Sequence, residues 1–198
     1  DLLGRLQHED ARERSVRAMA ARYHVDKSQA RRVAKTAASL LEQCAGPWNL
    51  EIPLGGHILD WSARLHEIGL DISHDGFQRH GAYIAAHADL PGFPLAEQRL
   101  LAFLIGSQRH AINTGFQKVL PRVWREPALR LAILLRLAVL LNRSRSALDL
   151  PPVTITPGDK SLLLQFDSDW LAANPLTVAD LERETGYLSA VGYELGFN

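Results

Sequence analysis

The spacing of apolar side chains over the first 150 residues favours a series of helices. Between residues 16 and 23 apolar positions recur every three or four residues, which is the period of one helical face. Asp26 followed by Gln29 has the form of a capping box and predicts the start of a second helix, which ends before Gly46-Pro47. Further helices are predicted over residues 58–68, 75–88, 94–109 and 127–143.

The helix predicted over residues 127–143 is apolar on nearly all of its sides. Such a helix has no face suited to water, so it belongs at the centre of a bundle. We therefore predict one helical domain over residues 1–150, with this helix surrounded by the others.

The pattern changes after Pro151-Pro152. Residues 153–156 and 161–166 flank a turn and predict a hairpin, residues 177–187 predict a helix, and residues 193–197 predict a third strand. The predicted fold class is therefore mainly α. A helical bundle is followed, over residues 151–198, by a small α+β subdomain with a short antiparallel sheet.

Composition narrows the class of protein. The chain has 198 residues, 46% of them hydrophobic, and a formal net charge of zero, so a folded globular protein is expected rather than a disordered one. No apolar run approaches the roughly 20 residues of a membrane span. The single cysteine, Cys44, and the absence of a visible signal peptide predict a cytoplasmic location. Because the sequence opens on Asp1 and its only methionine is Met19, we expect a segment of a longer protein.

The zero net charge hides an uneven distribution. Residues 1–150 carry 20 Lys and Arg against 15 Asp and Glu, whereas residues 151–198 carry 2 against 7. The window from Arg99 to Arg145 holds nine basic side chains and one acidic one, Glu126. This basic window is the first indication of an anionic partner.

Histidines and carboxylates gather between residues 65 and 83. His66, Glu67, His74 and His80 lie on predicted consecutive helices and the loop that joins them. Imidazole and carboxylate groups are good metal ligands, and a bound divalent ion could activate water against a phosphate ester. The same side chains could instead make structural hydrogen bonds, act as helix caps or lie on the surface.

Leu-His-Glu-Ile-Gly at residues 65–69 resembles the Leu-His-Asp-Ile-Gly signature of the HD superfamily of metal-dependent phosphohydrolases. That family binds metal through a His on an early helix, the His-Asp pair and an Asp on a late helix. The early His corresponds to Gln29, the pair to His66 and Glu67, and the late Asp to Val139. Valine cannot bind a metal and glutamine is a poor substitute for imidazole, so the resemblance implies an HD-like bundle whose metal centre is dismantled.

Longer blocks at residues 65–83, 88–93, 134–142 and 169–182 resemble the C-terminal half of the exopolyphosphatase and guanosine pentaphosphate phosphatase family. The resemblance covers essentially the whole chain. In that family two preceding domains hold the catalytic glutamate, glycine-rich phosphate loops and Mg²⁺. The resemblance thus implies that this segment carries no catalytic residue, binds no cofactor of its own and packs against its own N-terminal catalytic domains, with Mg²⁺ bound there.

The basic window then acquires a role, because inorganic polyphosphate is a long flexible polyanion. Arginine suits bidentate phosphate contacts and lysine supplies a mobile charge, and both gain affinity through counterion release. One departure is that Gln108-Arg109-His110 stands where the family often has His-Arg-Lys. These charges could also simply solvate a helix face. The candidate polyphosphate-binding residues are Arg79, His80, Arg109, His110, Lys118, Arg122 and Arg125.

The leading hypothesis is a polyphosphate-binding and dimerisation region of an exopolyphosphatase, inactive alone and forming a homodimer as the family does. A guanosine pentaphosphate phosphatase is an alternative parent protein. A second hypothesis is an autonomous HD-type phosphohydrolase using His66, Glu67, His74 and His80 around a metal. Nucleic-acid binding is disfavoured by the pI of about 7.3 and the lack of clustered aromatic residues.

Overall fold

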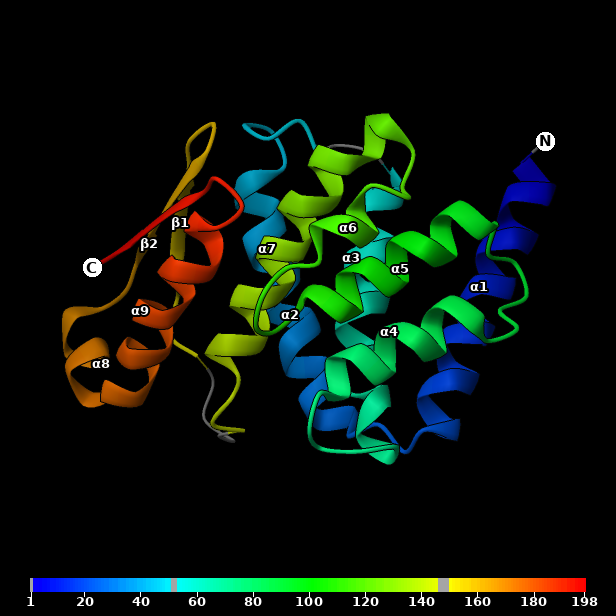
Figure 1. Ribbon diagram of the computed structural model, residues 1–198, viewed down its shortest axis with the longest axis horizontal. Coiled ribbons are helices and arrows are strands. Elements are labelled where there is room, and N and C mark those ends of the chain that lie inside the picture. Colours follow the sequence, from blue (N-terminus) through cyan, green and yellow to red (C-terminus); the bar gives the residue numbers. More distant parts are fainter. Residues whose placement is uncertain (1, 51–52, 146–149) are drawn as a thin grey trace.

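The computed structural model describes residues 2–50, 53–145 and 150–198, and its elements are mostly helices (Figure 1). The predicted mainly α fold class is confirmed. In chain order the elements are α1 Leu2–Arg22, α2 Lys27–Cys44, α3 Pro53–Leu65, the 3-10 helix η1 Ile68–Asp71, α4 Phe77–His87, α5 Leu95–Ser107, α6 Thr114–Gln117, the 3-10 helix η2 Arg122–Trp124, α7 Arg125–Leu141, β1 Thr154–Pro157, β2 Ser161–Gln165, α8 Ser168–Ala173, α9 Pro175–Ser189 and β3 Glu194–Phe197.

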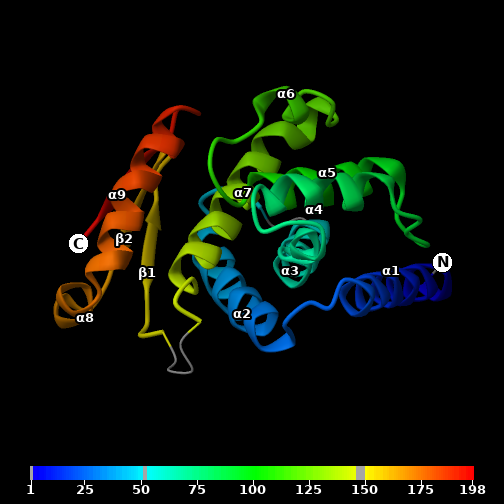
Figure 2. The same cartoon turned by 60° about the horizontal axis from the view of Figure 1, so that its bottom comes forward.

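Helix α7 lies at the centre of the molecule, as its apolar sequence predicts. Every residue from Leu131 to Leu141 is buried, and α2, α3, α5 and α9 all pack against the helix. Figures 1 and 2 place α1 at one end of the molecule and the sheet with α8 and α9 at the opposite end. The core is one continuous hydrophobic cluster, to which the C-terminal segment contributes Ile155, Leu164 and Leu181.

Two details at helix ends differ from the predictions. The Asp26 side chain accepts hydrogen bonds from the backbone N–H groups of Ser28 and Gln29, so it caps α2 as expected. The reciprocal half of the capping box is not made, because the Gln29 side chain points into the bundle instead. The third helix ends at Leu65 rather than at residue 68, which leaves His66 and Glu67 in the turn before η1.

The C-terminal sheet has the order β1-β2-β3. Strands β1 and β2 form the predicted antiparallel hairpin, with Ile155 opposite Leu164. Strand β3 pairs parallel to β2, with Leu162 opposite Leu195, so the expectation of a wholly antiparallel sheet is wrong for this strand. The reason is the connection: α8 and α9 carry the chain back to the starting end of β2 before β3 begins, as in other parallel crossovers.

Polar contacts join this C-terminal segment to the bundle. Arg136 in α7 makes a two-pronged ion pair with Glu184 in α9, at 2.5 and 2.9 Å, and both side chains are buried. The Tyr193 hydroxyl donates to Glu126 at 2.6 Å, and Trp48 donates its ring N–H to the carbonyl of Gly158 at 2.8 Å. These bonds cross the boundary that the sequence predicts at residue 150, and the division into two domains stays a prediction.

Candidate functional site

The His66 side chain is almost fully buried at the end of α3, with 1% of its surface exposed. Its Nδ1–H donates to the carbonyl of Ala63 at 2.6 Å, which leaves Nε2 as the free ring nitrogen. Burial lowers the pKa of His66 to about 4, and the nearby charge of Arg145 adds to this effect. His66 is therefore a neutral imidazole over the physiological pH range.

Gly69 of the same motif has a packing role. A Cβ atom at this position would lie 1.9 Å from the backbone carbonyl oxygen of Phe77 and 2.6 Å from the backbone nitrogen of Gly81. The backbone of η1 can approach α4 this closely only because residue 69 has no side chain. The glycine of the Leu-His-Glu-Ile-Gly motif thus fixes the packing of α4 beside His66.

Glu67 pairs with an arginine rather than with His66. Its Oε1 contacts the guanidinium of Arg145, which also lies 3.2 Å from Asp26, whereas Nε2 of His66 is 3.8 Å from Oε1 of Glu67. Burial raises the pKa of Glu67 above its usual value, and Arg145 opposes that shift. The side-chain cation of Arg145, in the segment after α7, therefore pairs with the buried Glu67 and the exposed Asp26 together. Arg145 was not among the candidate site residues predicted from the sequence.

The other positions implied by the HD resemblance approach the same place from α2 and α7. Gln29 is buried, donates to the carbonyl of Asn142 at 2.8 Å and accepts from Arg32. Val139 is buried on α7, one turn before Asn142. Two residues of this kind supply no anionic or imidazole ligand, so the residues present do not fit the metal that the HD resemblance implies.

The remaining histidines lie elsewhere. His74 is exposed in the loop after η1, and His80 is partly exposed on α4. Among the described residues, no three His, Cys, Asp or Glu side chains are grouped so that they could hold a metal ion. The geometry therefore gives no support to the autonomous phosphohydrolase.

Six of the seven predicted polyphosphate-binding residues fall into three groups, and His80 belongs to none of them. Arg109 belongs to the first, just after α5, where its guanidinium lies 5.3 Å from the centre of the Phe77 ring. Partial burial lowers the pKa of Arg109 below its usual value, and the charges of Arg143 and Arg183 lower it further, while Asp180 opposes them. Arg143 and Arg183 both pair with Asp180, but Arg109 pairs with no carboxylate of the described residues. We call Arg109, Arg143 and Arg183 the arginine cluster.

Arg79 and His110 form the second group, at the mouth of a cavity of about 690 Å³ between α4, α5 and residues 110–116. We call this the α4–α5 cavity. Both side chains are exposed, and His110 has a left-handed backbone with φ 58°. Burial and then the charge of Arg109 lower the pKa of His110, so the arginine cluster and this mouth are electrostatically coupled. His80 does not line the cavity.

Lys118, Arg122 and Arg125 form the third group, around α6 and η2. The Arg125 guanidinium donates to the carbonyls of Lys118, at 2.6 Å, and Leu120, at 3.3 Å. These bonds hold the loop between α6 and η2 against Arg125. Lys118 and Arg122 are exposed. Arg143 and Arg183 were not predicted as neighbours of Arg109. Arg143 lies inside the basic window but was not among the candidates, and Arg183 lies outside that window, in the acidic C-terminal segment.

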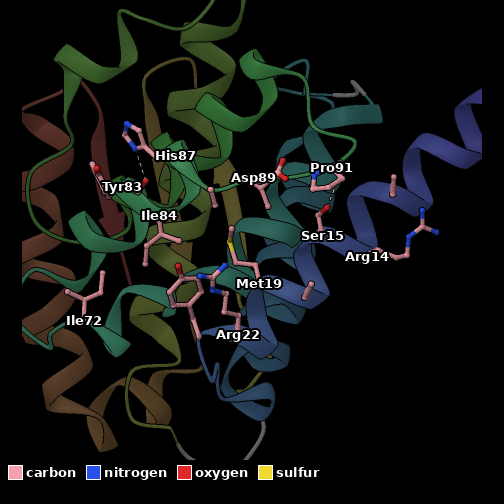
Figure 3. Close-up of a pocket in the computed structure, with 15 residues that line it drawn as sticks. Arg14, Ser15, Met19, Arg22, Ile72, Tyr83, Ile84, His87, Asp89 and Pro91 are labelled. Atoms are coloured by element: carbon pink, nitrogen blue, oxygen red, sulfur yellow. Dashed lines mark hydrogen bonds between the residues drawn. The ribbon is translucent and has the colours of Figure 1, made fainter.

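A second large hollow, of about 710 Å³, lies between α1 and α4 (Figure 3). Its lining is mostly apolar and includes Met19, Ile84 and Tyr83, whose ring stacks on His87 at 4.2 Å between centroids. Arg14 and Arg22 line its α1 side. None of the predicted site residues lines this hollow.

Comparison with known proteins identifies what the chain is similar to. The family model described as Ppx/GppA phosphatase, domain III, matches residues 11–185. A guanosine-5'-triphosphate,3'-diphosphate pyrophosphatase of Photobacterium profundum is 34% identical over 98% of this chain. Proteins of the same name from Vibrio campbellii and Vibrio cholerae are 38% and 36% identical over 98% and 96% of it. The chain spans 38–39% of the length of these relatives. Within the described residues, every helix is too short or too polar to cross a lipid bilayer.

Proposed function

Since this chain belongs to the Ppx/GppA phosphatase family, as its domain III in the C-terminal region, we propose that it binds the phosphate chain of the substrate while preceding domains cleave it. The preferred substrate is inorganic polyphosphate, with Mg²⁺ and the catalytic groups on those domains. We also propose that the region dimerises and acts in the cytoplasm.

The arginine cluster is the observation that carries this proposal. Arg109 has no carboxylate partner among the described residues and sits close enough to Arg143 and Arg183 for their charges to lower its pKa. Arg143 and Arg183 share one carboxylate, Asp180, so the three arginines of the cluster are only partly compensated. A phosphate bound there would relieve the repulsion between them. The mouth of the α4–α5 cavity, with Arg79, extends this positive surface along α4.

A second candidate is that the parent protein prefers guanosine pentaphosphate. The observation in its favour is that the relatives named above carry the name of a guanosine-5'-triphosphate,3'-diphosphate pyrophosphatase. The two substrates differ in length. Because polyphosphate is long, it can contact the arginine cluster and Arg79 at once. Comparing the protein with and without this region on phosphate chains of increasing length tests the choice: a benefit that grows with chain length favours polyphosphate, and one that does not favours the nucleotide.

Binding itself is tested by fluorescence anisotropy with end-labelled long polyphosphate, titrated with this chain at several salt concentrations. Arg109→Gln should weaken binding about fivefold at low salt and lower the slope of log affinity against log salt by about 0.7, the value for one lost phosphate contact on a single strand. Arg99→Gln is the matched control, because Arg99 is an exposed arginine on α5 outside the cluster. Equal binding by the two variants, or binding that ignores salt, would contradict the proposal.

Dimerisation is tested by sedimentation equilibrium of the same chain. The proposed homodimer should dissociate with a single constant as the protein is diluted. A monomer at every concentration would remove dimerisation from the proposal and leave polyphosphate binding unaffected.

A further inference from the structure

Two exposed valines lie in the basic segment between α6 and α7. Val119 has 51% of its surface exposed and Val123 has 78%. Lys118 and Arg122 directly precede them, are exposed, and pair with no carboxylate of the described residues. Polyphosphate has no apolar part to place against a valine, so binding of a polyanion does not account for this surface. We call residues 118–123 the basic loop.

The opposite charge occurs where α8 meets α9. Leu176 is 83% exposed, more than any other large apolar side chain of the described residues. Leu176, Ala179 and Glu182 follow one another at three-residue steps, so they are neighbours on the exposed side of α9. Asp169 is exposed on α8, and within the part of the chain that the structure describes neither Asp169 nor Glu182 has an ion-pair partner. We call Asp169, Leu176 and Glu182 the acidic corner.

The basic loop and the acidic corner complement each other in charge. Residues 118–125 contain three basic side chains and no acidic one, whereas residues 167–182 contain four acidic side chains and no basic one. Arg183, which follows, is already paired with Asp180. On contact the exposed apolar side chains of both surfaces would be removed from water, and the charges around them would select the partner.

The two surfaces are apart within one chain. The basic loop directly precedes α7, whereas Figures 1 and 2 place α8 away from it, towards the other end of that helix. A second copy of the chain can bring an acidic corner to the basic loop. A single contact of this kind would leave one loop and one corner free for further copies, whereas two equal contacts about a twofold axis close a dimer.

We propose that the basic loop of one copy packs on the acidic corner of a second copy, and that the reciprocal contact closes the dimer. This inference rests on the proposed dimerisation and names the surfaces that form it. Val123 and Leu176 are covered in the contact. Lys118 and Arg122 then face carboxylates of the second copy rather than polyphosphate, and the polymer is left to the arginine cluster and the mouth of the α4–α5 cavity.

Sedimentation equilibrium of this chain tests the apolar part of the contact. Val123→Ser and Leu176→Ser should each raise the dimer dissociation constant at least tenfold, because each change occurs twice in a closed dimer. Leu95→Ser is the matched control, since Leu95 is 58% exposed at the start of α5 and lies outside both surfaces; it should leave the constant within twofold of wild type. All three side chains are exposed, so the melting temperatures of the variants should stay close to that of wild type.

Charge reversal tests the pairing of the two surfaces. A loop variant, Lys118→Glu with Arg122→Glu, and a corner variant, Asp169→Lys with Glu182→Lys, should each be monomeric at concentrations where wild type is dimeric, because like charges then face each other at both contacts. Mixed in equal amounts, the two variants should form a heterodimer, since each of its two contacts again joins opposite charges. A mixture that stays monomeric would overturn the proposal.

The outcomes separate this inference from the proposed function. A wild-type chain that is monomeric at every concentration refutes the contact together with dimerisation, whereas a wild-type dimer that both charge-reversed variants preserve refutes the contact alone. Arg109→Gln should leave the dimer dissociation constant within twofold of wild type. Val123→Ser should leave polyphosphate affinity within twofold when monomeric chains are compared. A fivefold loss of that affinity without a change in the dimer would assign the basic loop to the polymer and overturn the proposal.

Discussion

The buried neutral His66 makes the fold sensitive to mild acid. In the folded protein burial holds the pKa of His66 at about 4, whereas an unfolded chain has the ordinary value of 6.5. Below pH 6.5 the unfolded chain takes up a proton that the folded protein refuses. Stability from this group is therefore complete above pH 6.5 and is lost as the pH falls towards 4.

The size of the effect follows from the two pKa values. The full interval from 6.5 to about 4 corresponds to roughly 3 kcal/mol at 1.36 kcal/mol per pH unit. Between pH 7.5 and pH 5.0 the linkage relation gives a loss of about 2 kcal/mol in the free energy of unfolding. Glu67 acts in the opposite direction, because its raised pKa makes the folded protein take up a proton first.

Urea denaturation followed by circular dichroism at these two pH values measures the loss. His66→Gln keeps a side-chain N–H for the carbonyl of Ala63 but cannot take up a proton, so it should lose about 2 kcal/mol less than wild type. Glu67 is present in both proteins, so its contribution to the pH dependence of stability largely cancels in the comparison. His87→Gln is the matched control, since His87 makes the same kind of bond, to the carbonyl of Tyr83, but is exposed. Equal losses for wild type and His66→Gln would refute the reasoning.

Three further predictions concern stability and are checked by urea denaturation at pH 7.5. Arg136→Met leaves Glu184 buried without its partner and should cost about 3–5 kcal/mol, whereas adding Glu184→Leu should restore most of it; no recovery would contradict the pairing. Asp26→Ala should cost about 1 kcal/mol through loss of the α2 cap. Gly69→Ala should cost about 1–3 kcal/mol because its Cβ meets the α4 backbone, whereas Gly186→Ala, which meets nothing within 4 Å, should gain about 0.5–1 kcal/mol.

The fold class could be predicted because its signals are local. The apolar residues on every side of 127–143 specify a central helix, and Asp26 specifies the start of α2 through contacts only two and three residues away. The direction of β3 could not be predicted, because a strand of four residues carries the same alternating pattern whether it pairs parallel or antiparallel. It is decided by α8 and α9, which carry the chain back to the starting end of β2 before β3 begins.

The candidate site was less accessible to sequence reasoning. The resemblance to known motifs pointed to Gln29, His66 and Glu67, but not to Arg145, which reaches Glu67 from 78 positions away. The basic window identified Arg109 and missed Arg183, because the two approach each other only through the packing of α9.

The guanidinium of Arg145 between Glu67 and Asp26 also has a consequence for how the protein responds to a shortage of metal ions. A bundle in which a bound ion balanced the carboxylates at this point would loosen whenever that ion was removed. Here the counter-charge is part of the polypeptide and cannot diffuse off. Chelators should therefore leave the melting temperature of this chain untouched, and its shape should be the same in a cell starved of transition metals as in one that is replete.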